Sequence, residues 1–266
     1  TAVNDAPVAS DLAVTTPEDT AVAITLSAID VDGDTPLSIR FGRAGHILGS
    51  AITIIRGTAN GRPRTVAYTG DIGRFQKPIL KNPTLDFEES DRRIDLLIME
   101  STYGNRVHEP VQDMKPRLKK VLLDTVERGG TLLIPAFAYG RTQELLYLIH
   151  ELYNEGDVRR VPVYVDSPLA TNITRVFGEH PEVSDSETHE TFLKKGKNPF
   201  FFDKVRFVGS VEESMALNRE EKPHIVISAS GMCEAGRVLH HLLFFGGLEI
   251  HASSPGSGRC YTSKPR

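Results

Sequence analysis

The chain lacks several features that would place it in a specialised class of protein. It has 266 residues and only two cysteines, Cys233 and Cys260, with no C-x-x-C pair. This excludes a disulfide-stapled secreted scaffold and a thiolate zinc knuckle. No apolar run approaches the roughly 18 residues of a membrane span, and no basic-then-apolar leader can be seen at the start. With 39% hydrophobic and 25% charged residues, the sequence predicts a globular protein without a membrane partner.

Lysine and arginine are missing from residues 1–38, which carry seven acidic side chains, whereas the rest of the chain has 31 basic and 28 acidic residues. So large a shift in charge predicts a boundary near residue 38. The larger part is mildly basic, which permits a nucleic-acid partner without requiring one.

The acidic segment has a repeat-like pattern. Its stretches Asn4–Val8 and Pro17–Thr20, followed by Asp30, Asp32 and Asp34, resemble the cadherin-like tandem repeats of bacterial surface proteins. Such repeats are β-sandwiches of about 100 residues, of which only about 38 match here. The three aspartates could supply oxygen ligands to calcium, although the glutamate that completes an EF-hand loop is missing. The alternative interpretation is an acidic turn.

The rest of the chain predicts an α/β fold. A hairpin is expected around Asn60–Gly61. Periodicity predicts strands at 51–55, 65–68, 96–99, 131–134, 161–165, 205–208 and 225–228, and helices at 114–127, 141–153, 169–179, 186–195 and from 236. The strand at 96–99 is of the buried type. Repeated strand-then-helix units favour a mostly parallel sheet covered by helices.

Polar loops directly follow four of the predicted strands. They are Glu100–Gly104, Pro135–Arg141, Asp166–Pro168 and Ser228–Met232. Ligands bind at the carboxyl ends of strands in an open α/β sheet, so four such loops on one edge would form one groove. The alternative is that each loop is an ordinary turn or helix cap.

Two side chains beside the hairpin have the chemistry of metal ligands. His46 precedes its first strand and Asp71 follows its second, so the two residues are expected to come close. A histidine nitrogen and a carboxylate oxygen are ordinary zinc ligands, although isolated residues of these types are more often structural. Of the other histidines, His150 is expected at the surface, and one of His240 and His241 is expected in the core.

Six motifs in this order make the sequence recognisable. They are Ala44–Ser50, Tyr68–Arg74, Met99–Asn105, Ile134–Gln143, Asp166–Ala170 and Ser228–Met232. Together they resemble the metallo-β-lactamase ribonucleases that carry an inserted beta-CASP domain. The resemblance covers about residues 36–243.

The resemblance implies a fold and a chemistry. It implies a partial metallo-β-lactamase sheet at 39–95 and a beta-CASP domain with a parallel sheet and helices on both faces at 96–245, after the partial cadherin-like repeat at 1–38. The glycine and serine content of residues 246–266 predicts a flexible tail. In this family two zinc ions activate a water that attacks an RNA phosphodiester. The implied partner is RNA, with a homodimer or an RNA-processing complex as further partners, and the implied location is the cytoplasm.

The resemblance also assigns roles to single residues. His46 matches a metal ligand, and Asp71 matches the carboxylate that bridges both ions. Glu100 matches an acidic residue that orients a catalytic histidine. The resemblance places the Ser228–Met232 loop, with Ser228, Ser230 and Gly231, beside the RNA backbone. Arg141, which opens a helix after an apolar strand, is equally consistent with an RNA phosphate contact and with a packing role.

The sequence departs from the family pattern at the metal site. The family motif His-x-His-x-Asp-His does not occur in it, and His251 matches neither of the family's two later histidine motifs. One histidine and one aspartate cannot hold two zinc ions tightly. We therefore expect a chain that does not cleave RNA, interpreted as a fragment, a fusion or a misassembled reading frame of a metal-dependent ribonuclease. The alternative function is a non-catalytic RNA-binding or scaffold module of a processing complex.

Overall fold

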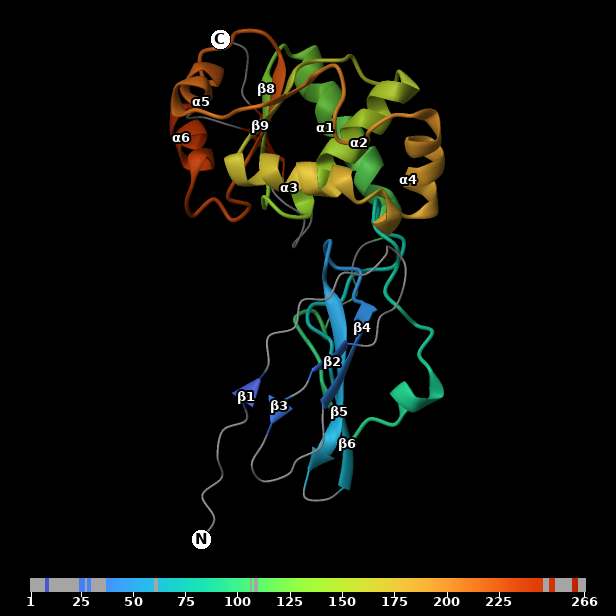
Figure 1. The fold of residues 1–266 in the computed structure, drawn as a ribbon. Coiled ribbons are helices and arrows are strands. Elements are labelled where there is room, and N and C mark those ends of the chain that lie inside the picture. The colour runs from blue at the N-terminus through green and yellow to red at the C-terminus, as the bar shows by residue number, and fades with distance from the viewer. Residues whose placement is uncertain are drawn as a thin grey trace. The chain divides into compact units, whose positions relative to one another are not determined.

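A computed structural model gives the fold (Figure 1) and describes residues 8–9, 24–26, 28–29, 37–59, 62–105, 107, 110–245, 249–251 and 260–262. The chain divides into two compact units, Thr1–Arg106 and Val107–Arg266. The proposed calcium ligands Asp30, Asp32 and Asp34 lie outside the described residues.

The first unit is built on a mostly antiparallel five-stranded sheet with the order β2-β4-β5-β6-β7. Its strands are β2 (Ile24–Leu26), β4 (Leu37–Arg43), β5 (Ala51–Ala59), β6 (Arg62–Tyr68) and β7 (Leu96–Ile98), and a separate pair joins β1 (Val8–Ala9) to β3 (Ala28–Ile29). Strands β5 and β6 pair antiparallel from Thr53 opposite Tyr68 to Ala59 opposite Arg62. The predicted hairpin is therefore confirmed.

Strand β7 is not buried, contrary to the expectation from its apolar sequence. It pairs in parallel with β6 and forms an edge of the sheet. Leu96, Leu97 and Ile98 are 53%, 52% and 48% exposed. Apolar composition predicts burial only where a second layer covers the strand, and no described element covers this one. Strand β7 lies in the first sheet, and the compact units divide after Arg106. The domain boundary expected between residues 95 and 96 stays a prediction.

The second unit has a six-stranded sheet with the order β10-β9-β11-β8-β13-β12. Its strands are β8 (Thr131–Pro135), β9 (Val163–Asp166), β10 (Val205–Phe207), β11 (His224–Ser228), β12 (Glu249–His251) and β13 (Cys260–Thr262). Its helices are α1 (Met114–Glu127), α2 (Arg141–Glu155), α3 (Pro168–Glu179), α4 (Ser186–Thr191), α5 (Val211–Leu217) and α6 (Arg237–Phe244). Single 3-10 turns lie at Glu89–Arg92 in the first unit and at Val111–Asp113, Pro181–Val183 and Leu193–Lys195 in the second.

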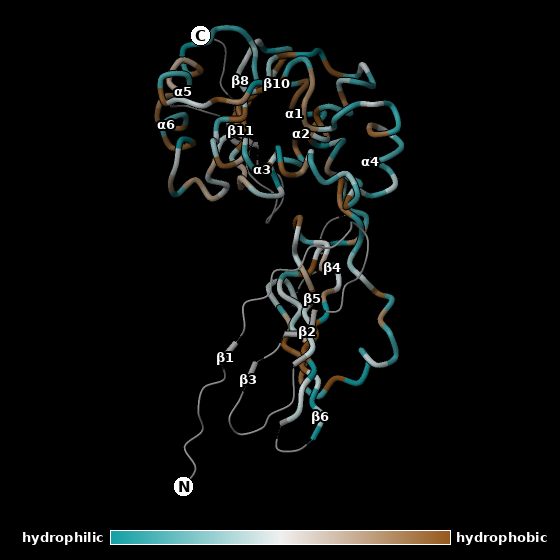
Figure 2. Tube along the Cα trace, in the orientation of Figure 1, coloured by the Kyte–Doolittle hydropathy of each residue, from teal (hydrophilic) through white to brown (hydrophobic). Residues whose placement is uncertain are grey.

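Helices cover both faces of this sheet, with α5 and α6 on one side and α1 and α2 on the other (Figure 1). Strands β8 to β11 pair in parallel, and every residue of the central strands β8 and β11 is buried. Strands buried on both faces favour apolar side chains, and brown, hydrophobic stretches lie near β11 in Figure 2. The predicted α/β fold class is confirmed.

Two elements differ from the sequence-based expectation. The segment 246–266, expected to be a flexible tail, contributes β12 and β13, and Tyr261 of β13 lies opposite Leu133 of β8. The glycine and serine content of this segment predicts a loop, so these two short strands were not expected. Helix α5 was not predicted, because its seven residues are too few for a clear helical period.

Candidate functional site

Three of the four polar loops meet at one edge of the parallel sheet. Ser228, at the end of β11, lies in register with Pro135 of β8 and with Asp166 of β9. The loops that follow these strands therefore begin side by side, as expected from the parallel arrangement. Glu100 was expected to follow a strand of this same sheet. That expectation is wrong, because Glu100 follows β7, which belongs to the other sheet.

The loop at 229–236 is closed on itself by backbone contacts. The amide of Val238 donates to the carbonyl of Ala229 at 3.1 Å, and the amide of Ser230 donates to the carbonyl of Ala235 at 3.3 Å. At Gly236, φ is +82°, and a Cβ atom would lie 2.7 Å from the carbonyl oxygen of Ala229. Only glycine fits this close approach, so the loop has a defined conformation.

The same loop packs against the loop that follows β8. A Cβ atom on Gly231 would lie 3.0 Å from the backbone nitrogen and from a ring carbon of Phe137. The hydroxyl of Ser230 accepts a hydrogen bond from the amide of Met232 at 3.3 Å. Ser230 and Gly231 are half-buried at this junction, where they form part of one continuous surface with Phe137.

The other two residues expected beside RNA are already engaged within the domain. The hydroxyl of Ser228 is buried and donates to the carbonyl of Asp166 at 3.4 Å. The guanidinium of Arg141, the first residue of α2, lies 3.0 Å from a carboxylate oxygen of Glu144. The RNA-contact roles of these residues remain predictions.

A buried charged network lies beneath these loops, and no local sequence pattern predicts it. The Asp166 carboxylate, which is 0% exposed, accepts hydrogen bonds from Ser214 at 2.6 Å, Arg237 at 2.7 Å and His241 at 2.8 Å. Burial acts to raise the pKa of Asp166, but these hydrogen bonds outweigh it and hold the pKa below its ordinary value. Arg237 and His241 stand at positions one and five of α6, so the network ties this helix to β9.

The candidate metal ligands of the first unit come together. Nε2 of His46, in the turn between β4 and β5, lies 4.0 Å from Oδ2 of Asp71, which follows β6. Glu100 is near them, since its carboxylate accepts a hydrogen bond of 2.6 Å from the amide of Ile72. That hydrogen bond, aided by the charge of His46, lowers the pKa of Glu100 despite its partial burial. The expected proximity of His46 and Asp71 is thus observed.

These residues do not complete a zinc site. A structural or catalytic zinc takes three or four protein ligands, and two of them around one ion lie about 3.4 Å apart. Here two candidate donors lie 4.0 Å apart with side chains 42% and 71% exposed. Within residues 37–245, as far as the structure describes them, no three histidine, cysteine, aspartate or glutamate side chains gather as a metal group. The donors present fit neither one closed zinc site nor a dinuclear one.

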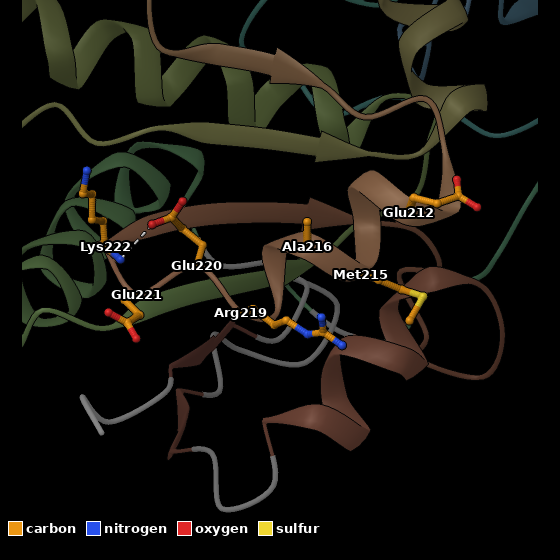
Figure 3. A pocket seen from close by; sticks show the side chains of 7 residues that line it. All are labelled: Glu212, Met215, Ala216, Arg219, Glu220, Glu221 and Lys222. Atoms are coloured by element: carbon orange, nitrogen blue, oxygen red, sulfur yellow. Dashed lines mark hydrogen bonds between the residues drawn. The ribbon is translucent and has the colours of Figure 1, made fainter.

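A separate pocket of about 580 Å³ lies beside α5 (Figure 3). Its lining residues are Glu212, Met215, Ala216, Arg219, Glu220, Glu221 and Lys222. The lining mixes three carboxylates with two cations, which favours no single ligand charge. None of the predicted site residues lines it.

No helix in the described part of the chain is long and apolar enough to cross a membrane.

Comparison with known families accounts for both units. Residues 142–246 match the family model described as the Beta-Casp domain, and residues 4–91 match that of the Bacterial Ig domain. The second match fits the cadherin-like character of the N-terminal segment but extends beyond the predicted boundary at residue 38. The resemblance to the beta-CASP ribonucleases of metallo-β-lactamase fold is confirmed, and residues 142–246 are a Beta-Casp domain.

Individual relatives agree with this family. Over 207 residues, or 77% of this chain, the sequence is 39% identical to ribonuclease TTHA0252 of Thermus thermophilus. It is 33% identical over 214 residues to the transcription termination factor FttA of Methanosarcina mazei, and 33% identical over 217 residues to an RNase J-like protein of Methanocaldococcus jannaschii. The chain spans 45%, 32% and 45% of these three relatives, which is less than half of each.

Proposed function

We propose that this chain binds single-stranded RNA at the carboxyl edge of the parallel sheet in its second unit, as a segment of a metal-dependent RNA-processing hydrolase. The observation that carries the proposal is the packing of Gly231 against Phe137, which joins two loops into one surface at the carboxyl edge of a parallel sheet. Two of the relatives named above are called ribonucleases, which supports RNA as the ligand class. A cytoplasmic location and a partner complex remain parts of the proposal.

Phosphodiester hydrolysis is not assigned to the described residues. His46 and Asp71 supply two exposed donors, whereas activating a water between two metal ions requires a nearly complete set of ligands for both. We therefore propose RNA retention without cleavage for this chain. This agrees with the alternative of a non-catalytic RNA-binding module.

Arg141 provides a test within the proposed surface. It follows the loop after β8, and its guanidinium is suited to a phosphate once RNA competes with Glu144. Arg128 is a matched control, because it lies at the end of α1 just before β8 begins and hence toward the opposite edge of the sheet.

The test is binding of a fluorescein-labelled 12-nucleotide RNA to the full chain in EDTA at several salt concentrations. We expect binding that weakens as salt rises, with a log–log slope reduced by about one in Arg141→Gln and unchanged in Arg128→Gln. Absence of binding at the lowest salt would overturn the proposed function. Equal slopes in both variants would remove Arg141 from the interface.

A further inference from the structure

Two aromatic side chains are displayed on the loop that follows β8. Phe137 is 55% exposed and Tyr139 is 37% exposed, whereas Ala136 beside them is 2% exposed. Met232, on the neighbouring loop, is 63% exposed. We call Phe137, Tyr139 and Met232 the apolar platform.

The loop that carries the platform is held in place from below. The side chain of Gln143, which is fully buried, accepts a hydrogen bond from the amide of Gly140 at 2.8 Å. Its amide nitrogen donates to the carbonyl of Ala138 at 3.2 Å and to the hydroxyl of Thr174 on α3 at 2.8 Å. A buried polar side chain with three satisfied partners fixes the backbone between the two rings.

The exposure of the rings is therefore built into the fold. Phe137 lies against the backbone of Gly231, and Tyr139 makes an edge contact with Phe177 at a centroid distance of 6.0 Å. Each ring is thus supported on one side and open on another. Large apolar side chains held at the surface of a rigid loop indicate a binding partner with a flat apolar face.

We propose that Phe137 and Tyr139 stack on the bases of single-stranded RNA, with Met232 extending the apolar contact. The inference rests on the proposed function and adds the mode of recognition. Every nucleobase has a π-face, so stacking supports binding without selecting a sequence. Bases inside a duplex cannot present that face, so the platform selects unpaired RNA.

The test compares two labelled 12-mers in EDTA, oligo(A) and an abasic ribose-phosphate oligomer of the same length. Phe137→Leu and Tyr139→Leu keep an apolar side chain but remove the ring. Each is expected to weaken oligo(A) binding by about fivefold or more while leaving abasic binding unchanged. Phe41→Leu is the control, because Phe41 is 58% exposed on β4 in the other unit and is expected to change neither. Phe137→Trp offers a larger stacking face and is expected to tighten oligo(A) binding.

The outcomes separate the two proposals. If the unsubstituted chain binds oligo(A) but the leucine variants bind it equally well, or lose abasic binding to the same extent, stacking is overturned and the proposed function stands. If the unsubstituted chain binds neither oligomer, both proposals fail. A lower melting temperature of Phe137→Leu, with unchanged oligo(A) affinity, would show that the ring serves packing instead.

Discussion

Nε2 of His241 lies 2.8 Å from Oδ2 of Asp166, and both side chains are completely buried. The other ring nitrogen of His241 lies 2.6 Å from Oδ1 of Asn218, just beyond the end of α5. The pair therefore joins β9, α5 and α6 beneath the loops that form the proposed RNA surface. It makes the geometry of those loops depend on one buried carboxylate.

Replacing that carboxylate is expected to be costly. Asp166→Asn keeps the shape but leaves the Arg237 guanidinium without its buried anion, so the free energy of unfolding should fall by about 3–5 kcal/mol. Urea denaturation followed by circular dichroism measures the change. Asp203→Asn is the control, because its ion pair with Arg160 is exposed and should contribute less than about 1 kcal/mol. Similar losses in the two variants would contradict a central role for Asp166.

The same carboxylate predicts a loss of stability in acid. The pKa of Asp166 is lower in the folded chain than its ordinary value of about 3.9, so below that value the unfolded chain binds more protons. Its stabilisation is complete above this pH and disappears as the pH falls through the folded pKa. Between pH 5 and pH 3, the free energy of unfolding should therefore drop more steeply in the unsubstituted chain than in Asp166→Asn. Parallel pH profiles would contradict this.

His150 predicts a second pH dependence at higher pH. Its ring is stacked on Phe202 and tilted against Phe192, each at a centroid distance of 4.6 Å, and burial lowers its pKa. The unfolded chain therefore takes up a proton first as pH falls below about 6.5, and stability declines from there. His150→Phe should flatten the stability profile between pH 6.5 and pH 5, although buried His224 contributes in the same direction. A stability profile of His150→Phe that runs parallel to that of the unsubstituted chain would contradict the prediction.

The exposed edge of the first sheet predicts self-association. Strand β7 presents Leu96, Leu97 and Ile98 with about half of each side chain in solvent. An apolar edge strand of this kind pairs readily with other chains. Leu97→Lys should reduce light scattering on heating while changing the free energy of unfolding by less than about 0.5 kcal/mol. Val107→Lys is a control, since Val107 is 98% exposed outside any strand. A reversible, monomeric melt of the unsubstituted chain would contradict the prediction.

The junction of the two RNA-facing loops is expected to tolerate no side chain at Gly231. An added methyl group would lie 3.0 Å from Phe137, so Gly231→Ala should displace the loop, lower the free energy of unfolding by about 1–3 kcal/mol and weaken RNA binding. Gly209→Ala is the matched control, because its nearest neighbour would be a Glu213 oxygen at 3.8 Å. Thermal melts and RNA titrations of both variants distinguish the outcomes. Unchanged RNA affinity in Gly231→Ala would show that the junction does not contact RNA.

Patterns set by neighbouring residues could be predicted well from the sequence. The helix expected at 114–127 is observed with these bounds, because its apolar period and the glycines after it are local signals. The proximity of His46 and Asp71 followed from a single hairpin. One buried and one exposed residue were expected in the pair His240–His241, and His241 is the buried one.

Features set by distant parts of the chain could not be predicted in this way. His150 was expected at the surface but is 6% exposed, because Phe192 and Phe202 close over it from another segment. Glu100 was expected at the same sheet edge as Ser228, but it follows β7, which belongs to a different sheet from β11. Helix α5 had a usable signal, the reciprocal capping of Ser210 and Glu213, which its short length obscured.

The number of zinc ions retained per chain after dialysis, measured by elemental analysis, tests most directly whether His46 and Asp71 lack the partners for a tight metal site. We expect far less than one tightly held zinc per chain, because no three histidine, cysteine, aspartate or glutamate side chains gather as a metal group within the described residues, and His46 and Asp71 lie 4.0 Å apart. The same sample should leave single-stranded RNA uncut. About two zinc ions per chain, with RNA cleavage that EDTA abolishes, would contradict the proposal of RNA retention without cleavage and would show that the chain holds a complete hydrolytic centre.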